Sequence, residues 1–186
     1  MLTGKKIVLG VSGGIAAYKM ANVASMLSKL HADIHVVMTE NATHFITPET
    51  FEVLTGNHCY TDTFDRCMEL HVPHIALGTQ ADAILIAPAS ADVVGKIANG
   101  IADDMLTTCV LPATCPVMLA PSMNVHMYEN PIVQDNMKRL ASYGYEIIEA
   151  DEGYLACRDI GKGKLPPEHV LVDYIIRACA MDKDLA

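Results

Sequence analysis

The sequence contains no tryptophan, and only 5% of its residues are aromatic. It also contains no apolar run of the roughly 20 residues that a membrane-spanning helix needs. Basic residues are few: 13 lysines and arginines stand against 22 acidic residues, which gives a formal net charge of −9. Because proteins bind phosphate backbones through basic faces, we expect no nucleic-acid partner. A basic amphipathic stretch is missing too, so we expect no membrane partner.

A secretion signal is also missing from the first residues, MLTGKKIVLGVSGG, which lack a long apolar region and a small-residue cleavage site. They favour a first buried strand and a cytoplasmic protein. The six cysteines are scattered with no C-x-x-C pair, so a disulfide framework is not expected. Cys109, Cys115 and Cys179 have apolar neighbours, which is typical of small buried side chains.

What is present is an alternation of apolar runs and helical patterns over 186 residues, 51% of them hydrophobic. The runs do not alternate strictly with polar residues, which is typical of strands buried on both faces of a parallel sheet; they span 6–11, 33–38, 82–88, 116–121 and 145–150. Helices are expected at 16–30, at 92–113 with a break near Asp103 and Asp104, after Pro131, and at 167–179. We therefore predict one domain, 1–186, with a flavodoxin-like or Rossmann-like three-layer α/β sandwich around a central parallel sheet.

In such a fold ligands bind beyond the carboxyl ends of the strands, so the residues after each run are the candidate site. Ser12, Gly13, Gly14 and Ile15 follow the first run. Glycines let a backbone approach an anion, and a following helix offers free N–H groups, so this turn suits a phosphate. It matches neither the P-loop nor the G-x-G-x-x-G pattern. A tight turn without a ligand is the alternative.

Thr39 and Asn41 follow the second run, and Glu40 between them could suit the ribose of a nicotinamide dinucleotide. Ser90 follows the third run, after Ala89 and before Ala91. Each of these side chains could instead cap a helix.

The loop PSMNVHMYENP places Asn124 after Met123. An asparagine side chain both donates and accepts hydrogen bonds, which suits a carboxylate or amide ligand, although an Asx-turn is the structural alternative. A soft-metal site from Met123, His126 and Met127 has no cysteine pattern to support it. Upstream, Cys67, His71 and His74 form a loose C-x3-H-x2-H set without a fourth ligand, so no metal site is predicted. His74 could instead titrate near neutral pH.

Cys157 lies in GYLACRDIGKGK, among glycines and charges. From the residues alone it could be a metal ligand, a disulfide partner, a nucleophile, a proton donor or a residue without a special role.

Five motifs occur in an order and spacing that resemble the flavin-dependent cysteine decarboxylases: SGGIAAYK, HIALGTQAD, PASADVVGKIANGIADD, PSMNVHMYENP and LACRDIGKGKLP. The resemblance spans roughly Lys5 to Ile176 and is greatest to the branch that acts on phosphopantothenoylcysteine in coenzyme A biosynthesis. It implies an FMN cofactor and a homo-oligomer, a trimer or a dodecamer of trimers, with active sites between subunits.

The resemblance also implies site residues. The catalytic residues would be His74, Asn124 and Cys157. The FMN contacts would be Ser12, Gly13, Gly14, Ile15, Thr39, Asn41, Ala89, Ser90, Ala91 and Met123. The substrate contacts would be Asn124, Tyr154, Ala156 and Lys162.

The implied reaction is decarboxylation of 4′-phosphopantothenoylcysteine to 4′-phosphopantetheine through a thioaldehyde and an ene-thiol. Asn124 would hold the carboxylate or the adjacent amide, His74 would assist the oxidation, and Cys157 would return a proton to carbon. The segment 151–165 would be a flap that closes over the substrate. Three motifs depart from the family pattern: Asp92 and Val93 replace asparagine and threonine, Arg158 replaces a glycine, and the first turn reads SGG where SGS is common.

Related functions remain open. A peptide decarboxylase that acts on a C-terminal cysteine, as in lantibiotic maturation, would leave its product oxidised. A flavin prenyltransferase would need a prenyl-phosphate site. A non-catalytic regulatory flavoprotein, like the relatives that inhibit a phosphatase, would bind a partner without turnover.

Overall fold

The computed structural model describes residues 2–64, 72–154 and 159–181. Its centre is a parallel sheet with the strand order β3-β2-β1-β4-β5-β6. The strands are β1 (Lys6–Val11), β2 (Asp33–Met38), β3 (Cys59–Tyr60), β4 (Ala83–Ala89), β5 (Val117–Pro121) and β6 (Glu146–Ile147). This order is that of the doubly wound Rossmann arrangement, so the predicted fold class is confirmed.

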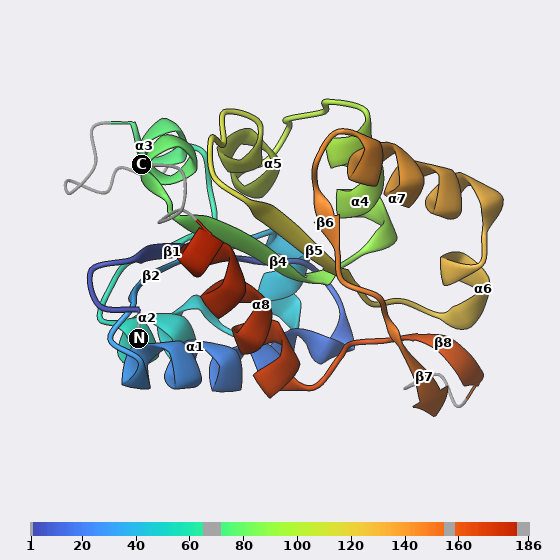
Figure 1. Cartoon of the computed structure of the whole chain (residues 1–186), viewed down its shortest axis with the longest axis horizontal. Coiled ribbons are helices and arrows are strands. Elements are labelled where there is room, and N and C mark those ends of the chain that lie inside the picture. The colour runs from blue at the N-terminus through green and yellow to red at the C-terminus, as the bar shows by residue number, and fades with distance from the viewer. Residues whose placement is uncertain (1, 65–71, 155–158, 182–186) are drawn as a thin grey trace.

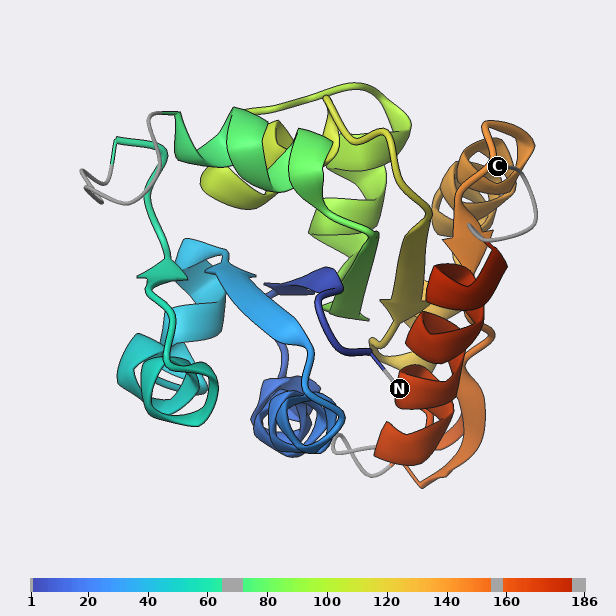
Figure 2. The ribbon, with the colours of Figure 1, turned by 60° about the vertical axis from the view of Figure 1, so that its left-hand side comes forward.

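Helices cover both faces of the sheet (Figures 1 and 2). One face carries α1 (Lys19–Lys29), α2 (Pro48–Thr55) and α8 (Glu168–Met181). The other face carries α3 (Pro73–Gln80), α4 (Ala91–Ala98), α5 (Met105–Val110) and α7 (Pro131–Ser142). Short elements connect them: the 3-10 helices η1 (Ile15–Tyr18) and η2 (Glu40–His44), and the helix α6 (Val125–Tyr128).

The central strands are buried on both faces, as their unbroken apolar runs predict. Side chains of β1 alternate between the two cores: Ile7 and Leu9 belong to the core under α1 and α8, whereas Val8 belongs to the core under α4 and α5. All three are fully buried. This alternation is the period-two geometry of a strand, and it fixes which residues can reach a ligand at the strand end.

Two predicted elements differ in detail. The helical segment 92–113 is broken as expected, because Asp104 caps α5 in a reciprocal capping box with Thr107. The last strand is shorter than predicted: of 145–150 only Glu146–Ile147 is strand, at the edge of the sheet beside β5.

A separate antiparallel hairpin, β7 (Asp151–Tyr154) and β8 (Ile160–Lys164), follows the main sheet. It packs against α6, since a Cβ placed on Gly161 would lie 2.6 Å from Cγ2 of Val125. Figure 1 shows the hairpin below α6, beyond the sheet. No helix among the described residues is long and apolar enough to cross a membrane.

The cysteines of the core behave as small apolar side chains. Cys109 and Cys179 are buried, and Cys115 is half-buried. Burial, followed by the neighbouring Cys115, raises the pKa of the Cys109 thiol to about 12. A thiol with such a pKa stays protonated at neutral pH, so Cys109 is not a nucleophile.

Candidate active site

The strand order reverses between β1 and β4, and their carboxyl ends define the candidate site. Ligands of doubly wound folds bind at this crevice. The backbone N–H of Ser12, the residue after β1, lies 3.4 Å from the carbonyl oxygen of Pro88. The turn 12–15 and the residues 89–91 therefore meet at one edge of the sheet, as the sequence predicts.

The side chain of Ser12 joins these two strand ends. Its Oγ donates to the carbonyl oxygen of Pro88 at 2.5 Å and accepts from the backbone N–H of Ser90 at 2.9 Å. Ser12 is fully buried and does not line either of the two pockets described below. Its hydroxyl thus joins the two strand ends beneath the site, and the FMN contact at Ser12 stays a prediction.

Gly13 brings a neighbouring loop into close contact with the turn. A Cβ on Gly13 would lie 2.5 Å from Cβ of Asn41, so no other residue fits without a shift. Thr39 caps η2, and its Oγ1 accepts from the backbone N–H of Ala42 at 3.3 Å. The loop 39–41 and the glycine turn therefore form one continuous wall.

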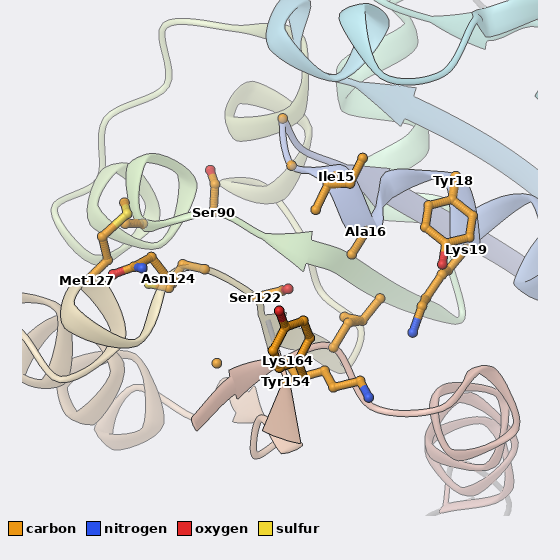
Figure 3. A pocket seen from close by; sticks show the side chains of 16 residues that line it. Ile15, Ala16, Tyr18, Lys19, Ser90, Ser122, Asn124, Met127, Tyr154 and Lys164 are labelled. Carbon is orange, nitrogen blue, oxygen red and sulfur yellow. The ribbon is translucent and has the colours of Figure 1, made fainter. Parts of the chain in front are cut away.

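A pocket of about 460 Å³ opens beside this wall (Figure 3). Its walls come from the glycine turn, η1, the start of α4, the loop before α6 and the hairpin. It brings together eight of the predicted site residues: Gly13, Gly14, Ile15, Ser90, Ala91, Met123, Asn124 and Tyr154. It also contains residues that the sequence reasoning did not name as contacts: Ala16, Tyr18, Lys19, Ser122, Met127, Gly163, Lys164 and Leu165.

A second pocket of about 450 Å³ adjoins the first and shares Gly13, Ser90, Ala91 and Met127 with it. Thr39 and Asn41 line this second pocket, together with four carboxylates and Lys96. Ala89 is fully buried at the end of β4 and lines neither pocket.

Lys96 neutralises part of that acidic wall. Its Nζ lies 3.2 Å from carboxylate oxygens of both Asp92 and Asp103. Burial lowers the pKa of Lys96, but hydrogen bonds to Asp103 and Asp92 outweigh it, so the net pKa is raised. Asp92, which departs from the family pattern, is therefore an exposed carboxylate paired with a stable ammonium group.

Asn124 lies where the main sheet and the hairpin meet. Its Oδ1 accepts from the backbone N–H of His126 at 2.9 Å, which caps α6. Its Nδ2 donates to Oδ2 of Asp159 at 2.9 Å. The Asx-turn and the pocket position thus occur together, and Asp159 orients the amide.

His74 and Lys162 lie outside both pockets. His74 is in the first turn of α3, which lies at the opposite side of the molecule from the hairpin in both ribbon views. Its Nδ1 is buried without a hydrogen-bond partner among the described residues. Lys162 is ion-paired with Glu149.

Other predictions concern residues outside the described ranges. Ala156, Cys157 and Arg158 belong to this group, and so do Cys67 and His71 of the loose C-x3-H-x2-H pattern. Among the residues with described positions, no three histidine, cysteine or acidic side chains are grouped so as to hold a metal ion.

The geometry is that of a doubly wound α/β protein with a pocket at the switch point, where such folds bind ligands. Residues 1–180 match the family model described as Flavoprotein. The chain therefore belongs to the flavoprotein family.

Two relatives make the comparison more particular. The chain is 49% identical over 172 residues to the coenzyme A biosynthesis bifunctional protein CoaBC of Bacillus subtilis. The aligned region covers 92% of this chain and 42% of the relative. It is 42% identical over 173 residues to the probable phosphopantothenoylcysteine decarboxylase of Streptococcus mutans. Here the aligned region covers 92% of this chain and 97% of the relative. The chain thus spans less than half of the bifunctional relative and nearly all of the shorter one.

Solved structures agree with this grouping. A cysteine-to-serine mutant of PPC decarboxylase, complexed with pantothenoylaminoethenethiol, superposes with a TM-score of 0.83 at 28% identity and covers 93% of this chain and 97% of its own. The FMN-dependent cysteine decarboxylase SpaF superposes with a TM-score of 0.82 at 35% identity. This match covers 96% of the present chain and 99% of the SpaF chain. The resemblance inferred from the five motifs is confirmed.

Proposed function

We propose that this chain is an FMN-dependent decarboxylase that converts 4′-phosphopantothenoylcysteine to 4′-phosphopantetheine in coenzyme A biosynthesis. The names of the relatives from Bacillus subtilis and Streptococcus mutans support the pathway and the substrate. The similarity to SpaF supports the cofactor. The observation that carries the proposal is the pocket that joins the glycine turn, Asn124 and Tyr154 from three distant segments.

The switch-point residues fit FMN on structural grounds. The two adjoining pockets, of about 460 and 450 Å³, are each within the size range of small-ligand sites, roughly 300–1,000 Å³. Gly13 lines both pockets and Gly14 lines the first, and without side chains they let a phosphate or ribityl chain approach the backbone. Ile15, Ala91 and Met123 would contact the flavin, and Thr39 and Asn41 would close the other side.

When bound, FMN supplies a two-electron sink that lets a cysteine carboxylate leave as CO₂ and then returns the electrons, so the net reaction is redox-neutral. Asn124 donates from Nδ2 and accepts at Oδ1, and Asp159 fixes its orientation. The amide is therefore suited to hold the substrate carboxylate or the amide beside it. Tyr154 and Met127 line the same pocket, where they would contact the bound substrate.

His74 requires a second subunit in this proposal. Because α3 lies across the molecule from the pocket, His74 acts in the site of a neighbouring copy, in a homo-oligomer that is a trimer or a dodecamer of trimers. Its half-buried imidazole, with Nδ1 unpaired among the described residues, leaves an atom that such a contact could use. The proposed enzyme works in the cytoplasm, and Cys157 is its proposed proton donor.

The test uses purified protein, a flavin absorbance spectrum, and CO₂ release from 4′-phosphopantothenoylcysteine and from a peptide with a C-terminal cysteine. We expect a yellow protein, release from the first substrate, and a saturated thiol as product. Asn124→Ala should keep the flavin but lose about 100-fold or more in rate, since it no longer positions the carboxylate.

Each competing function has its own outcome. A colourless protein that takes up no FMN would contradict the proposal entirely. Turnover of the peptide alone, with an oxidised product, would assign the chain to the peptide-modifying branch.

A further inference from the structure

The pocket of about 460 Å³, which we call the larger pocket, carries positive charge at one end. Its charged lining residues are Lys19 and Lys164, and no carboxylate among the described residues lines it. The second pocket differs, because Lys96 there faces Asp92, Asp103 and Asp104. The charged groups that line the larger pocket are therefore cationic, which suits an anionic ligand.

Lys19 and Lys164 have no carboxylate partner among the described residues. The contrast with nearby lysines is informative: Lys162, two residues from Lys164 on the same strand, is ion-paired with Glu149, and Lys5 is paired with Asp82. An ammonium group that is not neutralised locally is available to a bound anion.

The fold anchors the backbone from which both side chains project, although Lys164 itself is exposed. Lys19 begins α1 and is followed by the fully buried Met20. Lys164 ends β8 and is followed by Leu165, which is 2% exposed. Figure 3 shows both amino groups projecting toward the end of the pocket that is farther from Ser90 and Asn124.

The pocket is therefore polarised along its length. The end with Asn124 carries the groups that would hold the reacting cysteine, and the other end carries the two ammonium groups. Apolar side chains, including Ile15 and Leu165, complete the walls. The proposed substrate has the same order of parts: a cysteine carboxylate, an amide-linked arm with a dimethyl carbon, and a terminal phosphate.

We propose that Lys19 and Lys164 bind the phosphate of the substrate and make the enzyme selective for phosphorylated over unphosphorylated substrates. The inference rests on the proposed function. The resemblance implied Lys162 as a substrate contact, but Lys162 is paired with Glu149, so we assign the phosphate to Lys164, two positions along β8. Charge-assisted bonds to a dianionic phosphate are stronger than neutral ones, so two lysines at this end would discriminate strongly.

The experiment measures kcat/KM on 4′-phosphopantothenoylcysteine and on the same compound without its phosphate. We expect Lys164→Gln and Lys19→Gln each to lower the ratio of the two values about tenfold or more, and the double variant to lower it further. Lys164→Arg should keep most of the selectivity, because the positive charge remains. Lys162→Gln is the matched control and should leave the ratio unchanged.

Two further readouts separate the alternatives. The FMN content of Lys164→Gln should equal that of the wild type; loss of FMN would mean that the lysine holds the flavin phosphate instead. Equal losses on both substrates, or an effect of Lys162→Gln as large as that of Lys164→Gln, would overturn the inference.

Equilibrium binding of the two compounds to the FMN-loaded protein completes the test without turnover. Tighter binding of the phosphorylated compound, lost in Lys164→Gln and weakened by salt, supports the inference even if no CO₂ is released. Equal affinity of the wild type for both compounds would contradict it. Absence of turnover with selective binding would contradict only the proposed function.

Discussion

The two walls of the larger pocket are built in opposite ways. The wall at the switch point rests on fully buried strand ends, where Ser12 links the carbonyl of Pro88 to the N–H of Ser90. The hairpin wall is largely exposed: Tyr154 is 64% and Ile160 76% accessible, and β7 and β8 pair only with each other. A two-stranded sheet alone is marginally stable, so the hairpin depends on its contacts with α6.

This difference assigns a role to each wall. Because local stability follows burial, we expect the switch-point wall to open only with the whole domain and the hairpin to separate at lower cost. A fixed wall suits a cofactor that stays bound through many turnovers. A separable wall suits a substrate that must enter and leave; the flap at 151–165 stays a prediction.

The largest expected difference is in the free energy of unfolding, between a variant in the buried sheet and a variant in the exposed hairpin. Leu9→Ala, in the fully buried centre of β1, should lower the free energy of unfolding by about 3 kcal/mol, because it leaves a cavity between packed layers. Ile160→Ala, at the exposed hairpin, should change it by less than about 0.5 kcal/mol. Urea unfolding at one protein concentration measures both. Equal losses would show that the hairpin unfolds together with the sheet.

The second effect concerns the buried link in the fixed wall. Ser12→Ala should cost about 2 kcal/mol, since the carbonyl of Pro88 and the N–H of Ser90 lose their shared partner without access to water. FMN affinity should fall as well, because the strand ends that carry the glycine turn are no longer joined. Ser122→Ala is the control at a half-buried serine of the same pocket. Thermal unfolding that ranks the two variants equally would remove this role for Ser12.

The third effect tests the docking of the hairpin. Gly163 has a φ of +137°, and a Cβ there would collide with the carbonyl oxygen of Met123, whose own N–H donates to the carbonyl of Gly163 at 3.0 Å. Gly153 has a φ of +156° but ordinary space around it, with no atom closer than 3.7 Å. Gly163→Ala should therefore slow CO₂ release at least about tenfold more than Gly153→Ala. Both substitutions carry backbone strain, so the difference isolates the contact with Met123.

The buried strands and the turn of the switch-point wall could be predicted from the sequence, whereas the contacts of the hairpin could not. The runs 6–11 and 82–88 predicted strands correctly, because burial on both faces leaves an unbroken apolar pattern. The glycine turn and the helix caps could also be predicted from the sequence, because local backbone geometry favours particular residue types there.

The positions of the other candidate residues depend on tertiary contacts. Lys162 and Lys164 are equivalent in a sequence pattern, but in the structure Lys162 is paired with Glu149 and Lys164 lines the larger pocket. Ser12 is a typical phosphate contact by position, yet its hydroxyl faces the backbone of β4. The distance of α3 from the pocket likewise depends on the whole topology, and no local pattern near His74 encodes it.

The smallest effect compares two ion pairs, one in each region. Asp82 accepts hydrogen bonds from Nζ of Lys5 at 2.7 Å and from the backbone N–H of Lys6 at 2.8 Å, where β1 and β4 begin. Burial raises the pKa of Asp82, but these hydrogen bonds outweigh it, and the net pKa is lowered. A carboxyl group with a lowered folded pKa stabilises the protein above its unfolded pKa and loses that contribution as the pH falls through its folded value.

Asp82→Asn should therefore cost about 1 kcal/mol at neutral pH, and the cost should disappear below about pH 4. In the hairpin, the bond to Lys162 lowers the pKa of Glu149, and the same bond raises the pKa of Lys162. Both groups are fully exposed, so solvent screens the pair, and Glu149→Gln should leave the unfolding midpoint unchanged at every pH. Unfolding midpoints of both variants, measured from neutral pH to below about pH 4, test whether only the Asp82 pair contributes to stability. A pH-dependent loss in Glu149→Gln equal to that in Asp82→Asn would mean that the hairpin is held by charge as firmly as the strand ends, and the division between a fixed and a separable wall would fail.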